Sequence, residues 1–399
     1  MSDGHQHIST GERIAAYARN GGVTLRALAA RAGVSYSLLT KVTSGHRPAS
    51  PALVAAVARA LGVTVDLLEP QPHRDATTDP LMPLMAPIRA TLDLYDLAPQ
   101  EDVTPRPLPQ LRVAVAHINA LAQAAQYKPM AGALPGLLTE LHAAAHTFNG
   151  HDQQQAWGLL SEAYRCGHSV GIAIGLNGLS TTALNRMDWA AQRAGDRAPG
   201  LRAAREYLRV TAYLRTGDLE ACQRLQDSGR YFLEGTDPNT PGALVARGQL
   251  HLGSAVVAAR AGDKALMEHH LNEAARIAAR TGEQNDFSVH FGPTNVSVHR
   301  VMTLVEVGEH AQAVAASKSV RFPSDWAPTR IGHHHIDLAR SYRWLARPET
   351  ALYHLDQAYA AAPQQASRHP LVRETVTALA RTSHRHSDAL SVWITRTGV

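Results

Sequence analysis

The feature that most constrains the fold is a pattern of paired helices that recurs in the second half of the chain. Each copy is an alanine-rich amphipathic helix, a tight turn built on Gly-Asp, Gly-Glu or Arg-Pro, and a second helix. One such hairpin cannot bury its apolar stripe alone, so neighbouring hairpins must stack on one another. The turns begin at Gly217, Gly262, Gly308 and Arg347, with spacings of 45, 46 and 39 residues.

From about residue 110 onward, no alternating strand pattern interrupts these helices. We therefore expect an all-α fold in which residues 110–399 form a helical-repeat solenoid. The spacing exceeds the 34 residues of a standard tetratricopeptide repeat, which predicts longer helices or larger turns. The alternative is a generic all-α bundle whose turns are similar by chance.

Residues 9–69 predict a separate domain of five short helices. Small polar residues or a proline stand where helices would begin, and glycines stand where they would end. Thr24 and Ser35 are the expected N-caps of the second and third helices, and Gly33 the turn between them. Residues 70–109, rich in proline, are interpreted as a linker that carries one isolated helix at about 81–97.

Charge is concentrated near the N-terminus. The whole chain carries a net charge of +5, and residues 1–70 hold seven Lys/Arg against four Asp/Glu, which leaves +3 in this short segment. A mildly basic balance of this kind suits a protein with one nucleic-acid-binding patch.

The stretch "GVSYSLLTKVTSG" (33–45) separates polar from apolar side chains on a helix. At about 100° per residue, its polar arc holds tyrosine, serine, threonine and lysine but no carboxylate. Leu39 and Val42 lie on the opposite side. The polar face is therefore suited to an anionic partner.

A twenty-residue window from Leu25 has the pattern that a helix-turn-helix requires. A small residue is needed where the helices cross, a glycine at the turn, and apolar residues where the second helix docks. The window supplies them as Leu28, Ala29, Ala32, Gly33, Val34, Leu39 and Val42. Together with "LVAAVARALGVTVDLL", it resembles the phage-repressor and Cro-like (xenobiotic-response-element) family of helix-turn-helix regulators.

This resemblance implies roles for individual residues. The base-reading face would consist of Tyr36, Ser37, Thr40 and Lys41, with Lys41 suited to guanine O6 and N7. Phosphates would be contacted by Thr24, Arg26, Ser35 and Arg47. The family often has a glutamine at the position of Leu25, and leucine cannot make the backbone contact of that glutamine.

The C-terminal part has a resemblance of its own. "NDFSVHFGPTNVSVHRVMTLVEVGE" resembles actinobacterial regulators that join such a head to a tetratricopeptide-like array, over roughly residues 130–382. The architecture is also similar to that of peptide-pheromone receptors, whose arrays hold a signal on the concave face. Phe291, Asn295 and His299 are the candidate effector contacts. The alternative is that this segment is a packing knot between hairpins, in which Asn295 braces the turn.

Several site classes are not supported by the sequence. The histidines at 333–335 and at 269–270 are consecutive and point in different directions on a helix, so they cannot converge on one ion. His142 and His146 have helical spacing but no third ligand. We find no catalytic triad, no nucleotide-binding glycine loop and no paired carboxylates. We therefore expect no metal site, no cofactor and no enzymatic activity.

Cellular context follows from two further observations. Cys166 and Cys222 are too few for a disulfide framework. The N-terminus lacks the apolar run of a signal peptide, and no apolar stretch is long enough to cross a membrane. We expect a cytoplasmic protein with no membrane partner.

These observations predict a sequence-specific transcriptional regulator. It would bind a palindromic double-stranded DNA operator as a homodimer, and its helical array would dimerise and bind a small-molecule or peptide effector. Two alternatives remain: a ligand-free repressor or scaffold whose array only contacts protein, and an enzyme whose array shields a site with no known motif.

Overall fold

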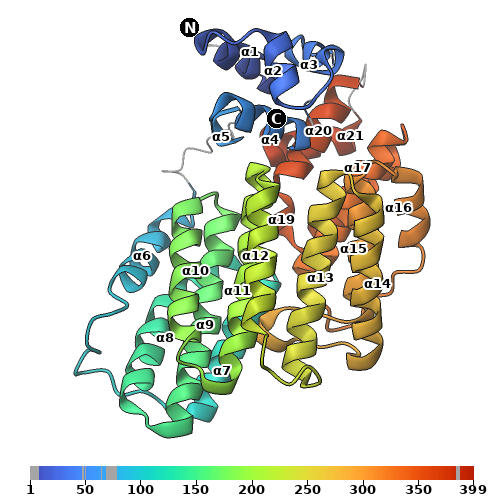
Figure 1. Ribbon diagram of the computed structural model, residues 1–399. Coiled ribbons are helices and arrows are strands. Elements are labelled where there is room, and N and C mark those ends of the chain that lie inside the picture. Colours follow the sequence, from blue (N-terminus) through green and yellow to red (C-terminus); the bar gives the residue numbers. More distant parts are fainter. Residues whose placement is uncertain (1–8, 47–48, 50, 64, 69–78, 383–386) are drawn as a thin grey trace, which may run out of the picture. The chain divides into compact units, whose positions relative to one another are not determined.

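The computed structural model describes residues 9–46, 49, 51–63, 65–68, 79–382 and 387–399 (Figure 1). Within these ranges the chain is helical, and its β pairing is one isolated bridge between Gln284 and Phe291. The expectation of an all-α fold is thus confirmed. The chain divides into two compact units, the first made of residues 1–76 and 210–223 and the second of residues 77–209 and 224–399.

The N-terminal segment contributes five short helices to the first unit, namely α1 (Thr10–Asn20), α2 (Leu25–Arg31), α3 (Tyr36–Thr43), α4 (Pro51–Leu61) and α5 (Val65–Leu68). The remainder of the chain holds helices of 4 to 24 residues. These are α6 (Met85–Asp93), α7 (Leu108–Gln123), α8 (Tyr127–Thr147), α9 (Gly150–Ala173), α10 (Asn177–Ala191), α11 (Ala198–Thr216), α12 (Leu219–Phe232), α13 (Pro241–Ala261), α14 (Lys264–Thr281), α15 (Pro293–Glu306), α16 (His310–Ser317), α17 (Pro328–Trp344), α18 (Pro348–Ala361), α19 (Pro363–Ala366), α20 (Pro370–Thr382) and α21 (Asp388–Thr397). Short 3₁₀ turns occupy Met82–Leu84, Gly195–Arg197 and Asp286–Ser288.

Side-chain caps fix where the first helices begin. Ser9 and Glu12 form a capping box at α1, in which each side chain satisfies the backbone N–H of the other. Thr24 and Ser35 accept hydrogen bonds at the starts of α2 and α3, as the sequence predicted. Gly11 allows α1 to run against α3, because a Cβ at that position would stand 2.1 Å from the carbonyl oxygen of Val42.

A single apolar core holds these short helices together. Helices of 4–11 residues are marginal alone in water, so their stability depends on this shared core. Its buried residues are Ile14, Ala18, Leu28, Ala29, Leu39, Val42, Ala49, Leu53, Val54, Val57, Ala58 and Leu68.

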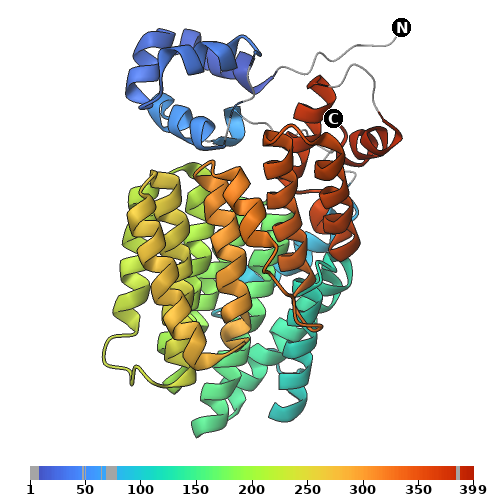
Figure 2. The same cartoon turned by 90° about the vertical axis from the view of Figure 1, so that its right-hand side faces the viewer.

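The two helices of each hairpin in the rest of the chain are joined by a turn that contains one residue in the left-handed conformation. Among the described residues, the left-handed position at each hairpin turn is taken by Ala125, Gly175, Gly217, Gly262, Gly308 or Ala346. After Ala125, Gly175, Gly262, Gly308 and Ala346, the next residue donates its N–H to the carbonyl five residues earlier, over 2.8–3.0 Å. That same residue is the N-cap of the following helix. This Schellman-type closure reverses the chain within two residues and so places successive helices antiparallel (Figures 1 and 2).

The turns at Gly217, Gly262 and Gly308 lie where the repeat predicted them. In the fourth turn, the left-handed residue is Ala346, one position before the expected Arg347. Two earlier hairpins, with turns at Ala125 and Gly175, escaped the sequence pattern because their turns lack the Gly-Asp, Gly-Glu or Arg-Pro pair.

Glycines at helix crossings make room for two phenylalanine rings. A Cβ on Gly248 of α13 would stand 1.9 Å from the ring of Phe291, and one on Gly200 of α11 would stand 2.2 Å from the ring of Phe287. Both rings are buried, at 0% and 6% exposure. The segment between α14 and α15 is therefore inserted between helices instead of running over the surface.

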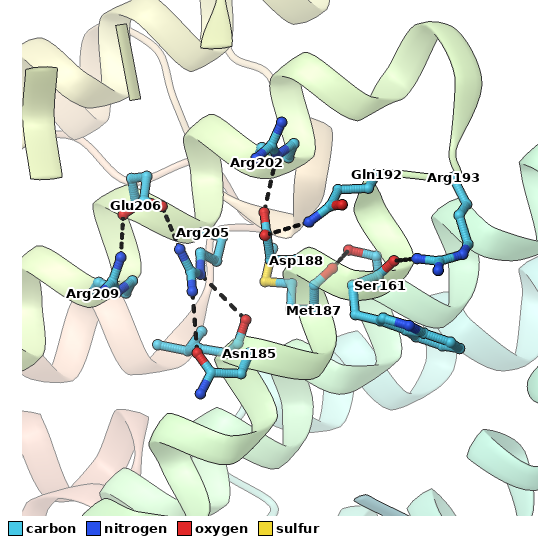
Figure 3. Close-up of polar contacts among 12 residues, drawn as sticks. Ser161, Asn185, Met187, Asp188, Gln192, Arg193, Arg202, Arg205, Glu206 and Arg209 are labelled. Carbon is cyan, nitrogen blue, oxygen red and sulfur yellow. Dashed lines mark hydrogen bonds and ion pairs between the residues drawn. The ribbon is translucent and has the colours of Figure 1, made fainter. Parts of the chain in front are cut away.

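Polar contacts fasten α10 to the helices on either side of it (Figure 3). Asp188 of α10 accepts a hydrogen bond from Arg202 of α11 over 3.0 Å. Ser161 of α9 donates to the carbonyl of Met187 over 3.0 Å. Glu206 of α11 is 1% exposed, and its carboxylate is paired with two arginines of the same helix.

The helix expected as an isolated element of the linker belongs instead to the second unit. It ends at Asp93 instead of about residue 97, and its apolar side chains Met85, Ile88 and Leu92 lie in the main core. Helix α6 contacts α8 and α10. The prolines on both sides of this helix led to the prediction that it is isolated. Its apolar face is instead buried in the main core, which joins it to the helices of the second unit.

A residue at the start of the second unit forms an ion pair with a residue in its C-terminal part. Asp79 forms an ion pair with Arg368, which lies between α19 and α20, and the second contact of this pair is 3.1 Å. Helices α7 and α17 are also in contact. Helices that are far apart in sequence thus meet, in addition to the contacts between successive hairpins.

A buried ion cluster joins three hairpins. Glu306 of α15 accepts from Arg260 of α13 over 3.0 Å and from Arg340 of α17 over 3.2 Å. Burial favours the neutral form of Glu306, but the two guanidinium charges outweigh burial and hold its pKa below the usual value.

Two histidine pairs occupy equivalent positions in different hairpins. His251 and His270 approach with their Nδ1 atoms 3.0 Å apart, and so do His335 and His354. Such a contact needs one donor and one acceptor, so the accepting ring must be neutral. Burial lowers the pKa of His251, His270 and His354 to about 4.

The hairpin turns predict opposite effects for two reciprocal substitutions. Gly262→Ala places a Cβ on a left-handed residue and is expected to cost about 1–2 kcal/mol, although a Cβ there meets nothing within 4 Å. Ala346→Gly relieves the same strain and is expected to cause no loss. Urea denaturation of both variants measures the effects, with hydrogen exchange of α13 and α14 for Gly262→Ala and of α17 and α18 for Ala346→Gly. Equal losses in the two variants would contradict this account of the turns.

The histidine pairs predict acid sensitivity. Unfolded histidines take up protons near pH 6.5, whereas the paired histidines resist protonation down to about pH 4. The free energy of unfolding is therefore expected to fall as the pH falls from 6.5 towards 4. The double substitution His251→Gln/His270→Gln should reduce this slope, and His117→Gln, on an exposed residue, should not. Identical slopes in both variants, measured by denaturation at several pH values, would refute the prediction.

Candidate nucleic-acid interface

Helices α2 and α3 are joined by a turn that the backbone fixes tightly. Gly33 has a φ of 65°, and Val34 donates its N–H to the carbonyl of Ala29 over 3.0 Å. Ser35 then accepts from the N–H of Leu38 over 3.2 Å and begins α3. The first turn of α3 is therefore held at a fixed place relative to α2.

One side of α3 faces the core of the domain, and the other is open. Leu39 and Val42 are buried at 0% and 2% exposure. Tyr36 is 46% exposed, and Ser37 and Lys41 are exposed as well. The structure thus brings three of the four predicted base-reading residues onto one accessible face.

Thr40 differs from the other three. Its side chain is half-buried, and its Oγ1 is buried with no hydrogen-bond partner among the described residues. The helical wheel placed Thr40 in the polar arc, and the packing of the domain leaves it only partly exposed. The accessible face instead extends to Ser44 and His46, which are exposed and contact each other over 2.8 Å.

The predicted phosphate contacts lie around this face. Thr24 and Ser35 are exposed, and their hydroxyl oxygens accept from backbone N–H groups. Each hydroxyl hydrogen remains able to donate to a phosphate oxygen. Arg26 is exposed, with its guanidinium 5.3 Å from the ring centre of Tyr36. Arg47 lies outside the described residues.

Leu25 packs against the core of the domain. Its side chain therefore has a structural role, which is consistent with the departure from the glutamine of the similar family.

The candidate effector residues occupy a different environment. Phe291 and Asn295 are 0% exposed, and His299 is 2% exposed. The side-chain amide of Asn295 donates to the backbone carbonyl of His290 over 2.6 Å. The backbone carbonyl oxygen of Asn295 lies 2.8 Å from Nδ1 of His299. Burial lowers the pKa of His299 to about 3, so its ring is neutral. This geometry favours the alternative in which the segment is a packing knot.

A surface pocket of about 260 Å³ lies elsewhere, at the ends of α12 and α13 that their connection joins. Its lining is made of Arg230, Leu233, Glu234, Arg247, Leu250 and His251. None of the three predicted effector residues belongs to it.

The described part of the chain offers neither a metal-binding group nor a membrane-spanning helix. No group of three or more His, Cys, Asp and Glu residues there is placed to hold a metal ion. No helix there combines the length and apolar character that a membrane span requires.

A family model described as a helix-turn-helix domain matches residues 10–71. Comparison with curated proteins and with solved structures finds no match. The match covers α1 to α5, including the α2–turn–α3 unit and its accessible face. Residues 10–71 are therefore a helix-turn-helix domain, which indicates a DNA-binding regulator.

Proposed function

We propose that the protein is a sequence-specific transcriptional regulator of the Cro-like type that acts in the cytoplasm as a homodimer on a palindromic operator. The observation that carries this proposal is the exposed polar face of α3, with Tyr36, Ser37 and Lys41, opposite the buried Leu39 and Val42. In a helix-turn-helix, that face enters the major groove.

Each residue type on this face suits a distinct contact. The ammonium of Lys41 matches the paired acceptors of guanine, O6 and N7. Ser37 can donate to or accept from a base edge, and the Tyr36 ring lies beside the cation of Arg26. Arg26, Thr24 and Ser35 then anchor the domain through phosphates, which fix its register but carry no sequence information.

We infer a dimer because one helix-turn-helix domain contacts only a short stretch of DNA. One helix-turn-helix reads a few base pairs, and two of them read half-sites about one helical turn, or about 10 bp, apart. We assign dimerisation to the tetratricopeptide-like array, and we assign to the same array the response to a small-molecule or peptide effector. Binding of an effector would alter how the two arrays pair and so the spacing of the heads.

The ligand-free repressor or scaffold stays as the second candidate. It is favoured by the burial of Phe291, Asn295 and His299, which leaves these side chains no exposed surface for an effector. Effector-dependent change in operator affinity separates the two functions.

Lys41 tests base reading. Lys41→Ala is expected to cost about 1–3 kcal/mol in operator binding and to relax the preference at one position of each half-site. Lys128→Ala, which removes an exposed lysine of α8, is the control and should bind normally. Selection from a random DNA library, followed by titration of the selected site, measures both effects. Unchanged sequence preference in Lys41→Ala would remove Lys41 from the reading face.

Arg26 tests phosphate anchoring. Arg26→Ala is expected to weaken binding to all sequences alike and to lower the slope of log affinity against log salt by about one. Titrations at several salt concentrations, with operator and with unrelated DNA, measure this. A loss confined to the operator would show that Arg26 reads sequence instead.

Dimerisation is tested on the full chain. Sedimentation equilibrium at micromolar concentration is expected to give twice the 43.0 kDa mass of one chain. A monomer that still protects a palindrome of two half-sites would contradict the assignment of dimerisation to the array.

A further inference from the structure

Five polar side chains gather inside the second unit, around the segment that the sequence had proposed for an effector. We call them the inner donor cluster, and they are Arg165, Gln249, His290, Trp326 and Arg330. They come from α9, from α13, from the segments before α15 and α17, and from the first turn of α17. Residues this far apart in the chain meet only because the hairpins stack.

Contacts through Asn295 connect most of the cluster. The amide of Asn295 donates to the carbonyl of His290 over 2.6 Å and lies 3.4 Å from Oε1 of Gln249. Its Oδ1 lies 3.4 Å from Nη1 of Arg330. The rings of His290 and Trp326 are 5.0 Å apart. Burial lowers the pKa of His290, and the positive charges of Arg330 and Arg165 lower it further.

Donors in this cluster outnumber acceptors. Nε1 of Trp326, Nε2 of Gln249 and Nε of Arg165 are buried and have no hydrogen-bond partner among the described residues. Nε2 of His290 is also buried without a partner among the described residues, and it donates or accepts according to the tautomer of the ring. Trp326, Gln249 and Arg165 are 5%, 1% and 7% exposed. Buried donors of this kind are rare in folded proteins, because each one gives up hydration without a replacement bond.

The donors also lie beside two positive charges. Arg165 uses Nη2 on Asn119 over 2.5 Å, and Arg330 has the long contact to Asn295. The carboxylate that acts on His290 is Asp325, which is exposed. A group that accepts several hydrogen bonds and carries negative charge would satisfy both the donors and the cations.

We propose that the inner donor cluster binds a small carboxylate anion. A carboxylate is an acceptor without donors, it forms its shortest bonds with cationic N–H groups, and its single charge suits two arginines that already have partial partners. The rings of Trp326 and His290 supply flat walls for the organic part of the molecule.

The site has a consequence for regulation, which rests on the proposed function. An anion held by this cluster would bond to α9, α13, the segment before α15 and α17 at once. In an array whose hairpins otherwise contact mainly their neighbours, such a link ties non-adjacent hairpins together. The bound anion would thus stiffen the array through which the two heads are paired.

Acetate is the probe, because a site for any small carboxylate must accept it. Thermal unfolding of the full chain is compared in potassium acetate, in potassium chloride at the same ionic strength, and in chloride with added acetamide. Acetate is expected to raise the unfolding midpoint by about 1–2 °C over both references. This gain should disappear in Trp326→Phe and in Arg330→Gln.

Trp393→Phe is the matched control. It removes the same indole N–H from a buried tryptophan, but there the N–H donates to Asp356 over 2.9 Å. In chloride, Trp393→Phe should lower the midpoint, whereas Trp326→Phe should leave it unchanged or raise it, because an unpaired buried donor is lost. Trp393→Phe should keep the acetate effect.

Three results would overturn the proposal. They are an acetate effect no larger than that of chloride or acetamide, an equal acetate effect in Trp326→Phe and wild type, or a loss of stability in Trp326→Phe as large as in Trp393→Phe. None of these readouts uses DNA. A chain that passes them but binds no operator would remove the proposed function alone, and operator binding without an acetate effect would remove this inference alone.

Discussion

The architecture of the larger part of the chain depends on one backbone constraint, the left-handed residue that ends the first helix of each hairpin. At Ala125, Gly175, Gly262, Gly308 and Ala346 the chain turns back, and the N–H of the next residue satisfies a free helix carbonyl. That next residue is also the N-cap of the following helix. Because no further residues are needed, the two helices of a hairpin are forced into contact along their lengths. The apolar stripes on their other sides then have only neighbouring hairpins to pack against.

Sequence reasoning predicted the fold class, the caps at Thr24 and Ser35 and three of the turns, because these depend on local chemistry. It failed where tertiary packing decides. Ala125 and Ala346 take left-handed conformations that a glycine pattern cannot reveal. Helix α6 looked isolated between prolines, yet its buried face belongs to the main core. The glycines at 200 and 248 have no turn to explain them, and only the phenylalanine rings that cover them do so.

The two candidate sites show the same division. Exposed residues of α3 were found from periodicity alone, since a helix buried on one side must expose the other, whereas the partial burial of Thr40 depends on how the whole domain packs. The inner donor cluster was not found, because its members are scattered from Arg165 to Arg330 and no spacing connects them. Phe291, Asn295 and His299 were the residues near it that the sequence selected. That selection marked the right neighbourhood but could not reveal that the free N–H groups belong to other residues.

The ion pair between Asp79 and Arg368, together with the contact of α7 with α17, has a consequence for how such a chain can evolve. Open arrays of hairpins gain and lose copies by duplication and deletion, because an added hairpin needs only a matching neighbour. Here the first described residue of the second unit is bound to a residue near its end. An inserted or deleted hairpin would move these partners apart and leave a buried carboxylate or guanidinium without its counter-charge. The number of hairpins between Asp79 and Arg368 is therefore constrained, and divergence in this part of the chain should proceed by substitution within hairpins instead of by change in their number.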